Sequence, residues 1–462
     1  MEETINNFSQ NDTEEDSLLS EKFYRQKNQN PVIDEFSQSR KPAVCVIGMG
    51  YVGFPLAVLA ASKGYEVFGF DTDTEKLKLI DKGANIAGEK YLDELIPKAK
   101  INTFHDPRLM RICDIFIICV PTPVDEKAHP ILDYVVSATR AIAQNAKKGA
   151  LVILESTVNP GVCEGVIGPI FEEAGYKIGQ DIFIVHCPER VNPGDATWNV
   201  TNLPRVIGSL DDAGLKKAME FYQSIVDAPI IAMDNIREAE AVKILENSFR
   251  DINIAFVNEL AKSFDRLDID ITNVIRGAAT KPFAFMAHWP GCGVGGHCIP
   301  VDPYYLIEEA KKNDFDHKFL RSARNINNSM PVYTVELLQE ALNSIEKSIK
   351  GTNIGILGVS YKANIGDLRE SPPLKIIELL RKKGANLHIF DPYIAKLSTT
   401  GSLAELLQKS EAIIVATNHR EFLQMPVEEF GNNNIRVIID GRNCLDKKAI
   451  KKLGIVYRGI GR

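Results

Sequence analysis

The chain has 462 residues, of which 45% are apolar and 25% are charged, and its formal net charge is -7. A chain of this length exceeds what one hydrophobic core usually serves, so two or three domains are expected. The negative charge, and the lack of a Lys/Arg cluster with interleaved aromatic residues, argue against nucleic acid as a partner. No apolar run is long enough to span a membrane, so no membrane partner is expected.

The first forty residues are rich in Asn, Gln, Ser, Glu and Asp, with neither a basic start nor an apolar core of signal-peptide length. We expect residues 1–40 to form a disordered or loosely attached tail, and the protein to be cytoplasmic. The eight cysteines lack the paired short spacing of a zinc site or of a secreted disulfide framework. The pattern therefore predicts reduced thiols and no metal site.

A glycine-rich turn follows the apolar run 43–47 and precedes the helix-like run 55–63. In a dinucleotide-binding turn Gly48 makes the tight bend, Gly50 lets a pyrophosphate approach, and Gly53 lets helix and strand pack closely. The next strand-like run, 65–70, ends at Asp71, whose carboxylate can accept hydrogen bonds from an adenosine ribose and favours NAD over NADP. The alternative is a related domain that binds another nucleotide. The cofactor-binding residues predicted in and after these two strands are Gly48, Met49, Gly50, Tyr51, Val52, Gly53, Asp71 and Lys76.

Further strand-like runs at 114–119, 150–154, 181–185 and 229–232 alternate with helical patterns. They predict a doubly wound α/β domain over residues 41–235. Pro121, Thr122 and Thr157 stand just beyond strand carboxyl ends, at the sheet edge where ligands bind, and we expect them to contact the cofactor.

Residues 237–268 contain almost no Gly or Pro and predict one long helix. Its apolar residues recur at three- and four-residue spacing, so it could join domains and support a dimer; they are Val242, Leu245, Phe249, Ile252, Phe256 and Leu260. Lys243 and Asn247 lie four apart and share a face. Helical spacing alone favours a solvent-facing pair.

A second α/β pattern has strand-like runs at 353–357, 387–391, 412–416 and 437–440. It lacks the full glycine fingerprint, which favours a nucleotide other than NAD. Lys362, Arg369 and Arg442 follow these runs and could meet phosphates, although each alone is more often a surface cation. The predicted fold is thus α/β, with two Rossmann-like doubly wound domains (41–235 and 346–462) joined by a long central helix within a helical middle region (236–345).

Residues 291–298 carry Cys298 on a glycine-rich loop, and Asp302 follows four residues later. Such a loop can hold a nucleophilic thiol against a substrate, whereas the alternative is a buried free cysteine in a glycine turn. Cys292 in the same loop is the rival, but it lacks a nearby downstream carboxylate. A thiol beside a nicotinamide indicates oxidation of an aldehyde through a thiohemiacetal and a thioester.

Several separated motifs together resemble the UDP-glucose/GDP-mannose dehydrogenase family, over residues 41–443. They are GxGYVGxP at 48–55, Pro-Thr-Pro at 121–123, Glu-Ser-Thr-Val at 155–158, Pro-Glu-Arg-Val-Asn-Pro-Gly at 188–194, Lys243-x-x-x-Asn247, Gly-Gly-His-Cys ending at 298, Tyr-Lys-x-x-x-x-Asp-x-Arg at 361–369, and Asp-Gly-Arg at 440–442. The resemblance implies NAD as cofactor, a UDP-sugar as substrate, a cytoplasmic enzyme of polysaccharide biosynthesis, and a homodimer or larger homo-oligomer.

The resemblance also implies roles for individual residues. Cys298 is the nucleophile, Lys243 and Asn247 hold the C6 oxygen, Asp302 and Thr157 position or activate water, and Glu189 assists thioester hydrolysis. Arg369 lies on the NAD side. The remaining substrate-binding residues are Arg190, Val191, Asn192, Gly291, Gly293, Gly295, Lys362 and Arg442.

The segment 188–194 departs from the glucose branch of the family. This departure, with His297 directly before the thiol, resembles the enzymes that oxidise UDP-N-acetylhexosamines, most closely those acting on UDP-N-acetylglucosamine. The manno and galacto epimers and UDP-glucose remain alternatives, and a catalytically silent nucleotide-sugar sensor is the alternative outside the enzymes. The arginine that a neighbouring subunit contributes in the family has no clear counterpart, and Lys281 or Arg276 could replace it.

Overall fold

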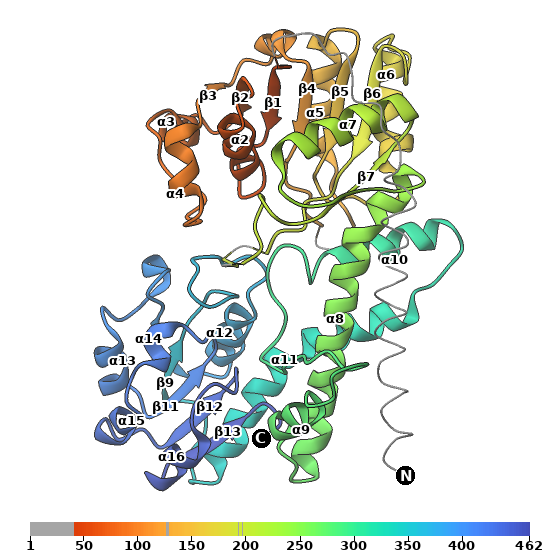
Figure 1. The fold of residues 1–462 in the computed structure, drawn as a ribbon. Helices are drawn as coiled ribbons and strands as arrows, with labels where there is room; N and C mark the ends of the chain where they lie inside the picture. Colours follow the sequence, from red (N-terminus) through yellow and green to blue (C-terminus); the bar gives the residue numbers. More distant parts are fainter. Residues whose placement is uncertain (1–40, 126–128, 193, 196) are drawn as a thin grey trace, which may run out of the picture. The chain divides into compact units, whose positions relative to one another are not determined.

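The computed structural model describes residues 41–125, 129–192, 194–195 and 197–462 (Figure 1). The expected tail at 1–40 and Pro193 lie outside the described residues.

The first sheet has eight strands in the order β3-β2-β1-β4-β5-β6-β7-β8. All neighbours pair in parallel except β6 and β7. The predicted strands are present, whereas β3 and β7 were not anticipated. The strands are β1 (Val44–Ile47), β2 (Val67–Phe70), β3 (Ile101–Phe104), β4 (Ile115–Ile118), β5 (Ala150–Leu154), β6 (Ile182–His186), β7 (Arg205–Ser209) and β8 (Ile230–Ala232).

Helices cover both faces of this sheet (Figure 1). In β1, Val44 and Val46 belong to one apolar cluster, whereas Cys45 and Ile47 belong to another on the opposite face. This alternation confirms the doubly wound arrangement. The first cluster takes in α2 (Gly53–Ser62), α3 (Thr74–Asp81), α4 (Leu92–Leu95) and α7 (Asp212–Ile225), and the second takes in α5 (Asp133–Asn145) and α6 (Gly168–Glu173).

The middle region is helical, as predicted. It consists of α8 (Ile236–Arg266), α9 (Ile271–Ala278), α10 (Asp302–Lys312) and α11 (Lys318–Asn343). Helix α8 begins with Asn235 as N-cap, whose side chain accepts from the backbone N–H of Glu238. Helix α11 packs on α8 through a buried ion pair in which Arg324 donates to Asp251 at 2.6 Å.

The large apolar residues of α8 do not form its packed face. Leu245, Phe249 and Phe256 are exposed by 65%, 48% and 54%, whereas Ile244, Ser248, Asp251, Ala255 and Asn258 are buried. Small and polar residues occupy the inner face because it carries hydrogen bonds to neighbouring elements, such as that from the Asn327 amide to Asp251 at 2.8 Å. Half of the apolar stripe predicted from the sequence is therefore exposed, whereas Val242, Ile252 and Leu260 are half-buried.

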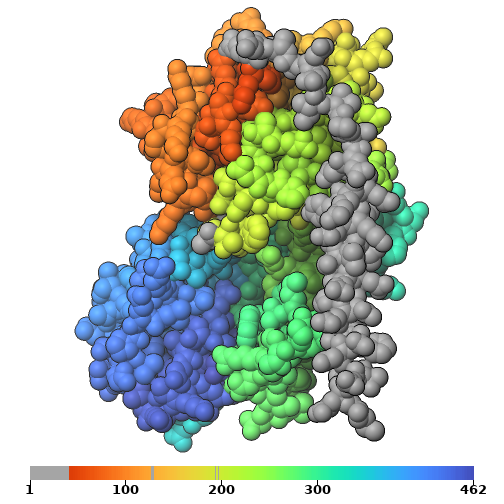
Figure 2. Space-filling model, viewed as in Figure 1, coloured from red at the N-terminus to blue at the C-terminus, as the bar shows by residue number. Residues whose placement is uncertain are grey.

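The second sheet has five parallel strands in the order β10-β9-β11-β12-β13. The C-terminal part of the chain, which contains this sheet, forms one continuous blue region in Figure 2. The last strand, β13, was not predicted. The elements are β9 (Asn353–Leu357), α12 (Pro372–Lys382), β10 (Asn386–Phe390), α13 (Leu403–Lys409), β11 (Ala412–Val415), α14 (Arg420–Leu423), α15 (Glu428–Asn432), β12 (Val437–Asp440), α16 (Lys447–Lys452) and β13 (Val456–Gly459).

In each sheet the strand order reverses beside the first strand: between β1 and β4, and between β9 and β11. Ligands bind open α/β sheets outside the carboxyl ends of the strands at such points. None of the described helices is both long and apolar enough to cross a bilayer.

Candidate active site

The glycine turn after β1 has the geometry that a dinucleotide needs. Gly48 has a φ of +92°, and a Cβ there would lie 2.7 Å from the Cys119 carbonyl oxygen. A Cβ on Gly53 would lie 2.1 Å from the Gly48 carbonyl oxygen, so only glycine lets α2 pack this closely. A Cβ on Gly50 would meet nothing within 4 Å. The open space beside Gly50, at the start of α2, fits a pyrophosphate.

Asp71 lies at the end of β2 beside this turn. Its carboxylate accepts from the Met49 N–H at 2.9 Å, the Asp73 N–H at 2.9 Å and the Lys76 ammonium at 2.7 Å. Burial by itself would raise the pKa of Asp71, but these hydrogen bonds bring it below its ordinary value. The predicted cofactor residues Met49, Asp71 and Lys76 are thus directly linked.

The loop of residues 291–298, the thiol loop, is anchored to the second sheet. The N–H groups of Cys292 and Gly296 donate to the carbonyl oxygens of Gly441 at 3.1 Å and Arg369 at 2.9 Å. The Gly291 N–H donates to the side chain of Asn258 on α8 at 2.9 Å. The loop therefore links α8 to the carboxyl end of the second sheet.

The predicted sugar-lining glycines also have a packing reason to be glycine. A Cβ on Gly293, whose φ is +133°, would lie 2.9 Å from Pro372, and one on Gly295 would lie 2.7 Å from the Tyr361 Cβ. At Gly291 the nearest atom to a Cβ would be the Arg442 guanidinium, at 3.3 Å. Two predicted substrate residues, Gly291 and Arg442, are thereby neighbours.

Helix α10 brings the carboxylate of Asp302 to α8. The Asn247 amide donates to Asp302 at 2.7 Å. Burial raises the pKa of Asp302 to about 6, against the opposing effects of Lys243 and of this hydrogen bond. Because Asn247 bonds to the buried Asp302 and Lys243 interacts with the same carboxylate, the solvent-facing interpretation of their spacing is wrong.

Cys298 and Lys243 affect each other's ionisation. Burial raises the pKa of the Cys298 thiol, and the Lys243 ammonium opposes this rise. For Lys243 burial lowers the pKa, but Cys298, Asp302, Glu189 and Glu155 more than compensate, so the net shift is upward. An ammonium held in its charged form beside a half-buried thiol can stabilise a thiolate or an oxyanion.

Beneath Lys243 lies a buried pair of carboxylates bridged by a guanidinium. Arg205, the first residue of β7, donates to Glu155 at 2.8 Å and to Glu189 at 3.1 Å, and the Tyr222 hydroxyl donates to Glu155 at 2.5 Å. Burial raises the pKa of Glu155 to about 7 despite Arg205. Sequence reasoning found Glu189 but missed Arg205 and Tyr222. The sequence feature that could have indicated Arg205 is its place at the start of a short apolar run, 205–209, where a charged residue needs a buried partner.

The segment after Glu189 reaches both α8 and the second sheet. The Val191 N–H donates to Glu189 at 2.6 Å, and the Arg190 guanidinium forms a bidentate pair with Glu246. The Asn192 side chain accepts from the Lys362 ammonium at 3.0 Å. The predicted substrate residues 190–192 are thus grouped with Lys362, but Arg190 already has an acidic partner.

Arg369 and Arg442 project from the second domain. Arg369 forms a pair with Asp367 at 2.6 Å, and its guanidinium lies 5.9 Å from the centre of the Tyr51 ring in the glycine turn. Arg442 donates to the carbonyl oxygens of Ala416 at 2.9 Å and Tyr361 at 3.2 Å. The structure therefore places Arg369 on the side of the first domain's glycine turn.

Of the other predicted residues, Val52 is half-buried and Pro121 is exposed. Thr122 is buried and its carbonyl accepts from the Tyr305 hydroxyl at 2.6 Å, which ties the Pro-Thr-Pro segment to α10. Thr157 is half-buried just after β5. The rival thiol, Cys292, is fully buried in the apolar core of the second domain, so it lies apart from the Lys243 group.

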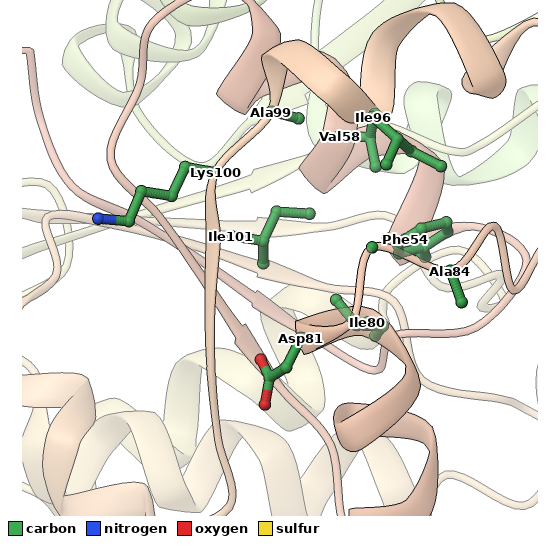
Figure 3. Close-up of a pocket in the computed structure, with 10 residues that line it drawn as sticks. Phe54, Val58, Ile80, Asp81, Ala84, Ile96, Ala99, Lys100 and Ile101 are labelled. Carbon is green, nitrogen blue, oxygen red and sulfur yellow. The ribbon is translucent and has the colours of Figure 1, made fainter.

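One cavity is not part of this site. It has a volume of about 170 Å³, lies beside α2 and β3, and is lined by apolar residues together with Asp81 and Lys100; none of the predicted site residues lines it (Figure 3). Within the described ranges no three His, Cys, Asp or Glu side chains are grouped as metal ligands.

Comparison with known proteins gives concordant matches along the chain. The UDP-glucose/GDP-mannose dehydrogenase family is matched by its NAD binding domain at residues 42–226, its central domain at 237–329 and its UDP binding domain at 355–447. The chain is 36% identical to the UDP-N-acetyl-D-mannosamine dehydrogenase of Pyrococcus horikoshii, over 91% of this chain and 99% of that protein. It is 34% identical to the UDP-N-acetyl-D-glucosamine 6-dehydrogenase of Salmonella typhi, over 84% and 92%.

The solved structure of the Pyrococcus horikoshii UDP-D-ManNAc dehydrogenase superposes with a TM-score of 0.85, covering 91% of this chain and 99% of that chain at 36% identity. The relatives and the fold thus agree along nearly the whole described chain.

Proposed function

Because the chain belongs to the UDP-glucose/GDP-mannose dehydrogenase family and is an NAD-dependent UDP-sugar dehydrogenase, we propose that it oxidises the C6 alcohol of a UDP-N-acetylhexosamine to the uronic acid. The proposed reaction consumes two NAD and one water. The observation that carries it is the arrangement around Lys243, which is electrostatically coupled to Cys298 and Asp302, while Asn247 bonds to the same aspartate.

The first half of the proposed reaction gives the aldehyde. NAD, when bound, accepts hydride from C6. Lys243 and Asn247, one helical turn apart, bind the C6 oxygen and stabilise the negative charge that develops on it. Met49, Asp71 and the space beside Gly50 would hold the cofactor, and Arg369, which lies next to Tyr51, would contribute a cation from the second domain.

The second half passes through Cys298. The Cys298 sulfur bonds to the aldehyde carbon to give a thiohemiacetal, and transfer of a second hydride to the second NAD, with loss of the hydroxyl proton, leaves a thioester. Water then replaces sulfur to release the acid and the thiol. Asp302, with its pKa raised to about 6, is suited to exchange a proton with that water near neutral pH. Thr157 positions the water, and Glu189, held by Arg205, assists hydrolysis.

Substrate placement follows from the second sheet. Lys362 and Arg442 lie beyond β9 and β12, beside the point where the strand order reverses, and we propose that they meet the diphosphate and uridine. Gly291, Gly293 and Gly295 lie along the sugar, and residues 190–192 face its N-acetyl group. Arg190 is held in a bidentate ion pair with Glu246, whereas Asn192 makes only single hydrogen bonds, so Asn192 is the better candidate to bond the acetamide.

The choice of epimer differs from the sequence-based expectation of UDP-N-acetylglucosamine. We propose UDP-N-acetylmannosamine as the first substrate, since relatives with that activity in their names reach 36% identity. UDP-N-acetylglucosamine is the second candidate, because the Salmonella typhi relative is 34% identical. The test compares kcat/KM for the manno, gluco and galacto UDP-N-acetyl sugars and for UDP-glucose. A preference for UDP-glucose contradicts the proposal, and absence of NADH formation with all four sugars would favour a sensor.

The assembly is also part of the proposal. Leu245, Phe249 and Phe256 leave an apolar stripe exposed on α8, and a second copy of the chain would cover it in a homodimer. Sedimentation of Phe249→Asp next to the unmodified chain tests this contact, and an unchanged sedimentation coefficient argues against it.

Eight unpaired cysteines accord with the cytoplasmic location that we include in the proposal.

A further inference from the structure

The two sheets place an aspartate at the same position. Asp71 follows β2, which pairs with β1, and Asp391 follows β10, which pairs with β9. The turns that they face are alike: the N–H of Gly48 donates to Phe70 and that of Gly358 donates to Phe390, both at 2.9 Å. The next residue donates to the aspartate in each domain, from Met49 at 2.9 Å and from Val359 at 2.8 Å.

The surroundings of the two carboxylates differ. Asp71 bonds outward to Lys76, whose side chain is 30% exposed. The side chain of Asp391 is fully buried, and its Oδ2 atom also accepts from the Ser360 N–H at 3.0 Å, the Ser360 hydroxyl at 2.8 Å and His419 Nε2 at 3.1 Å. Because its Oδ2 atom already accepts these bonds, the Asp391 carboxylate is not available to accept a hydrogen bond from a ribose hydroxyl. It stabilises the backbone of the loop after β9 instead.

His419 extends this hold to the far end of the same loop. Its Nδ1 atom accepts from the Asn364 N–H at 2.9 Å, so the ring proton resides on Nε2 and is donated to Asp391. Asn364 has a φ of +61°, and its side chain accepts from the Arg420 N–H at 2.9 Å. The buried ring lies between Tyr393 and Phe422, with centroid distances of 4.9 and 5.4 Å.

Residues 359–364, the clamped loop, are thereby fixed at both ends. Between the fixed ends lie Tyr361, whose carbonyl accepts from Arg442 at 3.2 Å, and Lys362, whose ammonium donates to Asn192 at 3.0 Å. Asp391 and His419, which fix the two ends, are not among the residues proposed to bind the substrate. They can therefore affect substrate binding only through the backbone of the clamped loop.

We propose that His419 is a positioning residue for the nucleotide of the substrate: by joining Asp391 to the Asn364 N–H it fixes the clamped loop, and with it Lys362 and the carbonyl that orients Arg442. This inference rests on the proposed role of Lys362 and Arg442 in binding UDP. Because the Asp391 carboxylate already accepts hydrogen bonds from its own loop and from His419, it also gives a physical reason why the second domain would bind a different nucleotide from the first.

The first test is a double-mutant cycle on UDP binding, measured by calorimetry with the full chain and UDP alone. His419→Phe keeps the packed volume and removes both polar links, so UDP affinity should fall on the order of tenfold or more, with NAD affinity unchanged. Lys362→Met should also weaken UDP binding. The combined loss in the double variant should be smaller than the sum of the two single losses, because part of the effect of His419 passes through Lys362 and the rest through the carbonyl that orients Arg442. His388→Phe on the neighbouring β10 is the matched control and should bind UDP normally.

Two amide replacements separate the ends of the clamp. Asn at 419 puts an acceptor near the Nδ1 position and keeps the Asn364 link, whereas Gln puts its amide near Nε2 and keeps only the Asp391 link. In either variant the first end of the loop keeps its bonds from Val359 and Ser360 to Asp391, whereas the far end is held by the Asn364 link. The His419→Asn variant should therefore bind UDP more tightly than the His419→Gln variant. Normal UDP affinity in His419→Phe, or strictly additive losses with Lys362→Met, overturns the inference. Failure of the unmodified chain to bind UDP would instead contradict the proposed function, so the two failures are distinguishable.

Discussion

Replacing Asp302 by Asn should stabilise the protein while removing most of its activity. Burial raises the pKa of Asp302 from its ordinary value of 3.8 to about 6. Between these two values the folded state binds more protons than the unfolded state, so stability falls as pH rises through this window and the full cost is present above pH 6. A difference of about two pKa units corresponds to ~3 kcal/mol.

The neutral amide removes this cost and can still accept the hydrogen bond from Asn247. The gain of ~3 kcal/mol is an upper limit, because Lys243 loses a negative neighbour. With an unfolding entropy of about 2.1 cal/mol/K per residue over the chain, it corresponds to a rise in Tm of ~3 °C at most. Turnover should fall on the order of a hundredfold, the usual contribution of a general acid or base.

The assay is thermal unfolding of Asp302→Asn and the unmodified chain at several pH values from 4.5 to 8, together with NADH formation at pH 7.5. The Tm difference should grow with pH up to about 6 and then level off. Asp316→Asn, at an exposed carboxylate bonded to Arg321, is the control and should show no such rise. A lower Tm for Asp302→Asn at pH 8, or a difference that does not change with pH, would refute the reasoning.

Three other predictions test separate parts of the site. Cys298→Ser should nearly abolish acid formation while leaving NAD and UDP affinity largely intact, whereas Cys292→Ser should retain turnover. Steady-state rates measure turnover and calorimetry measures the two affinities, and near-normal acid formation by Cys298→Ser contradicts the mechanism. Asp71→Ala should narrow the preference for NAD over NADP, measured as the ratio of kcat/KM values, and equal use of both cofactors by the unmodified chain contradicts the assignment. Arg205→Met should destabilise the protein by about 3–5 kcal/mol, since it leaves Glu155 and Glu189 buried without their cation, and a denaturation midpoint like that of the unmodified chain argues against the pairing.

Much of the fold was predictable because both domains repeat a local pattern. Apolar runs such as 43–47 and 353–357 contain few polar residues, as expected of strands covered on both faces, and Gly48 and Gly53 mark the turn between strand and helix. The strands that were missed, β3, β7 and β13, contain polar or charged residues such as Asn102, Arg205 and Arg458, which obscure the strand signal. Arg205 is charged because it neutralises Glu155 and Glu189, which the sequence places 50 and 16 residues away.

In the site, too, features set by neighbouring residues could be predicted, whereas features set by contacts between distant parts of the chain could not. Spacing correctly put Lys243 and Asn247 on one helical face, but the direction of that face depends on Asp302, which comes from α10 and lies 55 residues further along the chain than Asn247. Hydrophobic periodicity pointed to the opposite side of α8, where Leu245 and Phe249 are exposed. The reason is that periodicity reports only that an apolar face is to be covered, and says nothing of whether the covering partner is in the same chain.

The contrast between Asp71 and Asp391 carries this argument one step further. Each follows the second strand of its sheet and each accepts from the turn after the first strand, so a sequence pattern cannot tell them apart. Their side-chain partners differ: Asp71 bonds to a lysine five residues away, whereas Asp391 bonds to the Ser360 hydroxyl and to a buried histidine 28 residues away. The Asp71 carboxylate bonds to a partly exposed lysine, whereas the Asp391 carboxylate is buried and bonds to its own loop and to His419. We therefore expect the side chain that reaches each aspartate to contribute to the nucleotide preference of its domain, in addition to the glycines that precede it.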